Sequence, residues 1–319
     1  MNRSLCDYLR EITISLTIFL SACGPAAAGT APPTKAVQTN PVPTQTTSFL
    51  PSLTATLSAT PTSNLTQTLA EDERQATLLL ANAIDDALSA SAAEWHIQIQ
   101  TLDGKVLYTR LSDDPVYIDK LIHLPLAMLY LKGIESNNVT EIKKYLTAHG
   151  DYTTTLRQTL FESTVYDSQV AAKSLLTSIP DYGLNIIETL SSWEAAGTNL
   201  QHGQSTAGDL SRLMAGLYGR RMLSEESTIL ILDMLDQGVL SDDPLRDMAP
   251  AGTIIHDKRE LISGQGSMLA EAAVIDTGHI VYLVTILGLG NDSSLARYAD
   301  LLQTYEKIAA TFWVYTGTR

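Results

Sequence analysis

Two sets of residues in this chain offer the serine, histidine and aspartate of a nucleophilic catalyst: His123, Asp167 and Ser168 in one, and His256, Asp257 and Ser263 in the other. A serine hydroxyl becomes a nucleophile when a histidine in hydrogen-bond reach takes its proton and a carboxylate orients that histidine. Such sets work only if the fold brings their members together. The sequence alone does not show that either set converges.

A lysine and a histidine, Lys120 and His123, stand three residues apart in the apolar segment 117–131, the spacing of neighbours on one helix face. A lysine at a helix N-terminus is disfavoured by the helix dipole, and a nucleophilic amine needs burial to lower its pKa. A histidine at this kind of position is more often a partly exposed helix residue than a general base. We therefore expect that these residues do not catalyse hydrolysis.

The same segment, Lys120-Leu-Ile-His123-Leu-Pro, resembles the nucleophile motif Ser-x-x-Lys-Leu-Pro of class A β-lactamases and related penicillin-binding serine hydrolases. Lys120 stands at the serine that is acylated in that family, and His123 at the lysine that helps to activate it. The resemblance covers roughly residues 72–317. It implies a β-lactamase-like fold in which the nucleophile is missing.

The family's Ser-Asp-Asn motif aligns with Tyr166, Asp167 and Ser168, so only the largely structural aspartate agrees. Tyr166 could relay a proton, but we favour the interpretation that it packs beside the cleft. The deacylating Glu-x-x-Leu-Asn pattern is missing between Ser168 and Ser205. Glu194 is the only candidate for that glutamate by position, and it lacks the context.

The family's Lys-Thr-Gly strand motif, which binds the substrate carboxylate, aligns with Asp257, Lys258 and Arg259. This alignment puts an anion at the place of the cation and a bulky arginine at the place of the glycine. A mixed-charge cleft follows from it, with Lys120, His123, Tyr166, Asp167, Asp257, Lys258 and Arg259.

The elements that must position these residues are read from periodicity and turn signals. Trp95–Leu102 alternates with period two and is followed by Asp103-Gly104, which predicts a hairpin with the strand 105–109. Ser224 is an expected N-cap, and the segment 205–214 resembles a family helix start capped by a hydroxyl and an aspartate. The other expected elements are helices at 71–89, 120–133 and 293–315, a mostly helical stretch at 140–240, and strands at 268–276 and 279–287.

The predicted fold class is α+β: a β-lactamase/transpeptidase-like fold with an antiparallel sheet flanked by helices and an all-helical subdomain. We expect the domain at 70–319, with its α/β part at 70–119 and 250–319 and its helical part at 120–249.

The N-terminal region differs from the rest. Residues 12–22 are an apolar run too short to span a bilayer, and Leu20-Ser-Ala-Cys23 resembles a bacterial lipobox. We expect a lipoprotein signal peptide at 1–22 and a lipidated N-terminus at Cys23. The Thr-, Pro- and Ser-rich segment 23–69 predicts a disordered linker.

The composition narrows the function classes. A net charge of −14 argues against nucleic acid and against anionic headgroups. The cysteines are Cys6 and Cys23 and no His-x-x-x-His occurs, so we expect neither metal nor cofactor.

The predicted protein is an extracytoplasmic lipoprotein anchored through Cys23, with a non-catalytic domain that binds a cell-wall peptide or a protein or acts as a scaffold. The alternatives are an active serine hydrolase, that is a β-lactamase or a D,D-peptidase, and a structural protein with a filled cleft.

Overall fold

The computed structural model describes residues 63–137, 151–238, 243–262 and 266–317. The chain divides into Met1–Ser58 and Ala59–Arg319, and all described residues belong to the second unit. The expected signal peptide, Cys23 and most of the expected linker therefore lie outside the described residues, as does Ser263.

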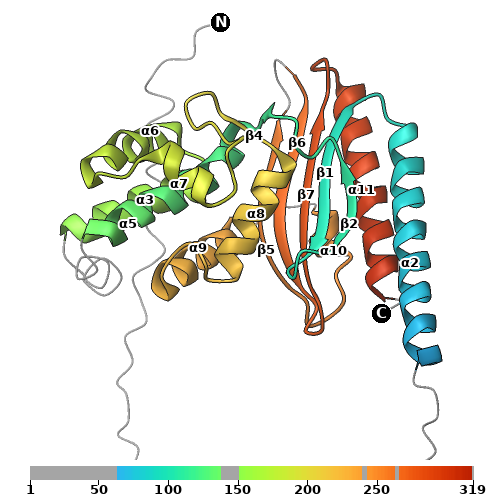
Figure 1. The fold of residues 1–319 in the computed structure, drawn as a ribbon. Helices are drawn as coiled ribbons and strands as arrows, with labels where there is room; N and C mark the ends of the chain where they lie inside the picture. The colour runs from blue at the N-terminus through green and yellow to red at the C-terminus, as the bar shows by residue number, and fades with distance from the viewer. Residues whose placement is uncertain (1–62, 138–150, 239–242, 263–265, 318–319) are drawn as a thin grey trace, which may run out of the picture. The chain divides into compact units, whose positions relative to one another are not determined.

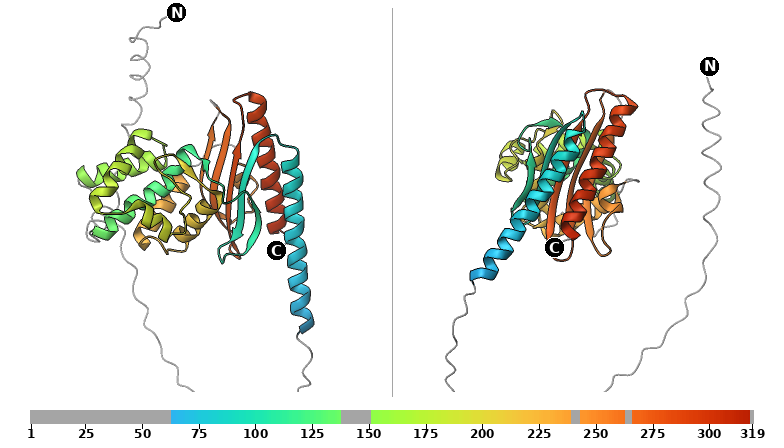
Figure 2. Two further views of the ribbon diagram at one scale, coloured as in Figure 1. Left: turned by 45° about the horizontal axis from the view of Figure 1, so that its top comes forward. Right: turned by 90° about the vertical axis from the view of Figure 1, so that its right-hand side faces the viewer.

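A five-stranded antiparallel sheet forms the centre of the domain, in the order β2-β1-β7-β6-β5. The strands are β1 (Glu94–Thr101), β2 (Val106–Arg110), β5 (Ile254–Ile262), β6 (Met268–Asp276) and β7 (Val281–Leu289). The N-terminal hairpin thus pairs with the last strand of the chain. Helices α2 (Ser63–Ser89) and α11 (Leu295–Gly317) lie side by side on one face (Figures 1 and 2).

The helical part follows β3 (Val116–Tyr117) and packs on the other face of the sheet, mainly through α8 (Figure 1). Its elements are η1 (Asp119–Ile122), α3 (His123–Asn137), α5 (Asp151–Thr164), α6 (Gln169–Ser178), η2 (Ile179–Tyr182), α7 (Ile186–Ser192), β4 (Gln204–Ser205), α8 (Ala207–Tyr218) and α9 (Glu225–Gln237). The short helix α10 (Pro244–Asp247) instead packs on α11, on the face that α2 and α11 cover. From Leu124 to Leu131, helix α3 is apolar on every side and buried, as expected for a central helix.

Side chains separate into one core on each face of the sheet because successive strand residues point to opposite sides. Leu269, Ala273 and Ile275 of β6 pack toward α2 and α11, whereas Ala270 and Ala272 pack toward the helical part. This alternation decides which charged residues of β5 face which partner.

The predicted hydroxyl caps are confirmed, whereas the carboxylate of Asp209, also expected to cap, bonds to the side chains of Thr198 and Arg212. Thr206 accepts a hydrogen bond from Asp209 N at 2.9 Å and caps α8, and Ser224 accepts one from Ser227 N at 3.3 Å and caps α9. Each cap satisfies a backbone N–H that the helix itself leaves without a partner.

The fold class is the one predicted, with local differences. Helix α2 begins at Ser63, inside the segment expected to be linker. The helix expected from Lys120 begins instead at His123, after a 3-10 turn. Pro125 explains this start, because proline has no N–H to donate and is tolerated only in the first helical turn. Among the described helices, none combines the length and apolarity needed to cross a membrane.

Candidate functional site

Five charged or titratable side chains meet where the helical part joins strand β5: Lys120, His123, Asp167, Lys258 and Glu260, here called the junction cluster. Lys120 Nζ lies 3.3 Å from Glu260 Oε1. Lys258 Nζ donates to the carbonyl of Thr164 at 2.8 Å and forms an ion pair with Asp167. His123 Nδ1 lies 3.8 Å from Asp167 Oδ1. Elements distant in sequence, η1, α3, the α5–α6 loop and β5, supply these groups.

The alternation of β5 corrects the expected place of Asp257 and Arg259. Lys258 and Glu260 face the junction cluster, whereas Asp257 contacts Arg246 of α10 and Arg259 lies over the ring of Tyr305 of α11. Asp257 and Arg259 are therefore on the opposite face of the sheet. An anion at the place of the family's lysine would repel a bound carboxylate, but Asp257 points away from the junction cluster, so this repulsion does not arise there.

On β5 it is thus Lys258, not Asp257, that shares the junction cluster with Lys120, and Glu260 lies on the same side. Successive strand residues point to opposite faces, so a one-residue difference in register decides which charges face this cluster.

Lys120 is held in its charged form. Burial acts to lower the pKa of the Lys120 amine, but attraction to Glu260 and Asp167 outweighs burial, so the pKa is raised. An amine is nucleophilic only when it is deprotonated, so this lysine is unsuited to covalent chemistry near neutral pH. Its side chain is 34% exposed, the most accessible of the cluster's cations.

His123 is buried, at 1% exposure, and not partly exposed as expected. Burial lowers its pKa, which favours the neutral ring, and Nδ1 donates to the carbonyl of Ser163 at 2.9 Å. No described hydroxyl group bonds to its ring. Ser168 instead uses its hydroxyl to cap α6, accepting from Ala171 N at 3.3 Å. His123, Asp167 and Ser168 thus do not form a catalytic triad.

The second candidate triad is not formed by its described members. His256 Nδ1 lies 2.6 Å from Asp236 Oδ1, while Asp257 accepts from Arg246 Nε at 2.7 Å. As neighbours along a strand, the two side chains point to opposite faces.

Of the residues aligned with the second motif and with the deacylating glutamate, Tyr166 and Glu194 lie outside the junction cluster, whereas Asp167 belongs to it. Tyr166 is 70% exposed, with its ring packed edge-on against Phe161 at 5.2 Å. Asp167 has a φ of 55°, an uncommon conformation for this residue type, and its carboxylate reaches Lys258. Glu194 lines a separate surface pocket with Asp103.

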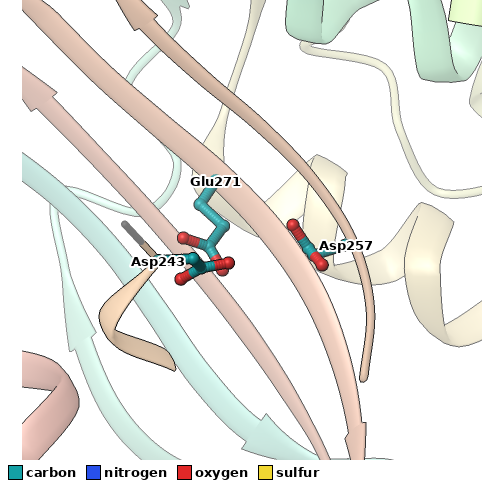
Figure 3. A group of neighbouring side chains, drawn as sticks. All are labelled: Asp243, Asp257 and Glu271. Atoms are coloured by element: carbon teal, nitrogen blue, oxygen red, sulfur yellow. The ribbon is translucent and has the colours of Figure 1, made fainter. Parts of the chain in front are cut away.

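Asp257 belongs to a second polar cluster that the sequence did not reveal. It lies with Asp243 and Glu271 in a buried group, the carboxylate trio, in which one oxygen from each residue lies within 4.8 Å of the other two (Figure 3). Figure 3 shows the carboxyl groups of Asp243 and Glu271 pointing toward each other, with Asp257 on the neighbouring strand. Arg246 and Arg259 lie in contact with this group, which fits a protein ion network better than a metal centre.

The comparisons agree with this architecture. The model of a family described as the beta-lactamase enzyme family matches residues 79–315. A beta-lactamase from Chitinophaga pinensis is 12% identical, with a TM-score of 0.58 over 73% of this chain and 97% of the other. A beta-lactamase from Sphaerobacter thermophilus is 15% identical, with a TM-score of 0.58 over 75% and 97%.

A third similar structure is a variant of PBP-A solved as an acyl-enzyme with penicillin G. It is 14% identical to this chain, with a TM-score of 0.57 over 75% of this chain and 97% of the other. At these identities the likeness shows the fold alone. No curated protein matches the chain significantly.

Proposed function

This chain belongs to the beta-lactamase enzyme family, and we propose that its domain is non-catalytic and acts as a binding or scaffolding module, because Lys120 aligns in sequence with the position of the family's nucleophile. The carrying observation is the ion pair of Lys120 with Glu260 in the junction cluster. Acylation needs an activated hydroxyl at this position, and a charged amine supplies no nucleophile.

The charge balance of the junction cluster supports this proposal. Two lysines face two carboxylates, so the cluster is neutral when His123 is neutral. The side chains of Lys258 and Glu260 are 6% and 7% exposed. A substrate carboxylate could bind Lys258 only by displacing Asp167 from it. A cation without such a partner would bind the carboxylate directly. The charged groups of the junction cluster thus bind one another, which favours a structural role for them.

The surface beside the junction cluster suits a peptide. Lys120 offers a partly exposed cation, and Tyr166 and Val170 offer exposed apolar area, at 70% and 82% exposure. The proposed partner is a cell-wall peptide with a free carboxylate, or a protein segment of the same character. Isothermal titration with a soluble stem peptide should give saturable heat that Lys120→Met and Tyr166→Ala both reduce. Absence of heat would leave the scaffold role alone.

We place the protein outside the cytoplasm, anchored to the cell membrane by lipid at Cys23. The support is the sequence Leu20-Ser-Ala-Cys23 at the end of a short apolar run. The acyl chains would hold the protein at the membrane, and the segment 23–69 would act as the tether to the domain.

Intact-mass measurement after exposure to penicillin G tests the loss of catalysis. We expect no adduct on the full protein and no hydrolysis of the antibiotic. PBP-A, which is known as an acyl-enzyme with penicillin G, serves as the positive control. A stoichiometric adduct on any serine would overturn the proposal and favour an active serine hydrolase.

A further inference from the structure

The carboxylate trio lies between strands β5 and β6 and helices α10 and α11. Glu271 of β6 is fully buried, Asp257 and Asp243 are 5% and 3% exposed, and Tyr305 of α11 is fully buried beside them. Among the described residues, Arg246 of α10 and Arg259 of β5 are the cations that face the trio. Opposite Glu271 on β7 stands the uncharged Ile286.

The charges of this group do not balance if every acid is ionised. The trio would carry three negative charges, and Arg246 and Arg259 supply two positive ones. One unit of negative charge would remain in a region closed to water. An uncompensated buried charge is so costly that the group takes up a proton instead.

The hydrogen bonds around Tyr305 also require one more hydrogen than its hydroxyl provides. The hydroxyl of Tyr305 lies 3.0 Å from Asp243 Oδ1 and within hydrogen-bond distance of Glu271 Oε2. A hydroxyl has a single hydrogen to donate, so it serves only one of these carboxylates. The other contact needs a hydrogen on the carboxyl group itself.

The surroundings identify the acid that holds this hydrogen. Asp257 is bound by Arg246, and Asp243 accepts from the backbone N–H of Leu245 at 3.0 Å. Glu271 has the weakest compensation: Arg259 Nε is 4.0 Å away, and no group in the described part of the chain bonds to Glu271 Oε1.

We propose that the carboxylate trio is a proton-binding site in which Glu271 is a neutral carboxylic acid, donating to Tyr305 while Tyr305 donates to Asp243. This chain of hydrogen bonds uses each hydrogen once and leaves the trio's two negative charges opposite two arginines. The bound proton joins the sheet to α10 and α11. Its loss as the pH rises weakens that contact.

The electrostatics agree in direction. Burial, followed by the negative charges of Asp243 and Asp257, raises the pKa of Glu271 well above the ordinary 4.5. A raised pKa in the folded state stabilises the fold fully below pH 4.5, and this contribution falls as the pH rises toward the folded pKa. In that window unfolding releases one proton, so the unfolding constant increases about tenfold per pH unit from this group alone.

The test compares urea unfolding of the full protein and of Glu271→Gln between about pH 5 and pH 8. Glutamine keeps the shape and a hydrogen to donate but cannot release a proton. We expect the unfolding constant of Glu271→Gln to rise less steeply with pH than that of the wild type, by a factor of about ten per pH unit. The exposed carboxylate Glu226 on α9 provides the control, and Glu226→Gln should leave the pH dependence unchanged.

Infrared spectroscopy of the unmutated protein gives a second, independent measurement. A neutral carboxylic acid has a C=O band distinct from carboxylate bands, and labelling with 13C-glutamate should shift that band at neutral pH. Identical pH slopes for wild type and Glu271→Gln, or no such band, would refute the proposal. So would a stoichiometric metal ion in the purified protein whose removal by chelation destabilises it, because the missing positive charge would then be the metal.

Discussion

Removing the charge of Lys258 should destabilise the fold more than any other single change in the junction cluster. In Lys258→Met the chain length is nearly kept, but Asp167 and the carbonyl of Thr164 lose their donor. Breaking a buried ion pair by removing one partner costs about 3–5 kcal/mol. Asp167 is 20% exposed and regains some water, so we expect about 3 kcal/mol. For a domain of this size that is a fall in Tm of roughly 6–12 °C.

A double-mutant cycle separates the ion pair from packing effects. Urea unfolding would be measured for Lys258→Met, Asp167→Asn and the combination. Because the two groups contact each other, their effects should be non-additive by about 2 kcal/mol, with the double variant more stable than Lys258→Met plus Asp167→Asn would predict. Lys173→Met, at an exposed position of α6, is the matched control and should change stability by less than about 0.5 kcal/mol. Additive effects, or a Lys258→Met variant as stable as Lys173→Met, would show that the ion pair of Lys258 and Asp167 does not stabilise the contact between β5 and the helical part.

Three further outcomes are expected. Lys120→Ser alone should not be acylated by a fluorescent penicillin, because His123 is buried and lacks the amine that activates the serine in the family; rapid labelling would contradict this. Thr206→Ala should cost about 1 kcal/mol in urea unfolding, since the N–H of Asp209 loses its cap, and an unchanged midpoint would count against the cap. Cys23→Ala should release the protein from the membrane fraction or leave an uncleaved precursor, and membrane retention with normal processing would exclude the anchor.

Much of the fold was predictable because its signals are local. The alternation of Trp95–Leu102 with the Asp103-Gly104 turn predicts the hairpin that the structure contains. Ser224 predicts the start of α9, because a hydroxyl before an apolar helical run satisfies the first N–H groups. The short β3–β4 ladder escaped prediction, since two residues per strand are too few to show a period.

The chemistry of the site was less predictable because it depends on the side each residue takes. Asp257, Lys258 and Arg259 were expected to line one cleft, whereas the alternation of the strand puts Lys258 and Glu260 together on the cluster's side and Asp257 and Arg259 on the other. That alternation was readable from the sequence. The contacts of Tyr305 with Asp243 and Glu271 could not be predicted from the sequence. The three residues come from separate elements, and no sequence spacing links them.

The strand order has a consequence for how the molecule is made. Strand β1 pairs with β2 on one side and with β7 on the other. Of these strands, β7 is synthesised last. Until β7 arrives, the open edge of β1 is available to other chains, and an open edge favours aggregation. Such long-range pairing also slows folding. A nascent chain of this protein must therefore keep its first strands protected through most of its own synthesis, and a truncation before Val281 would leave that edge permanently exposed.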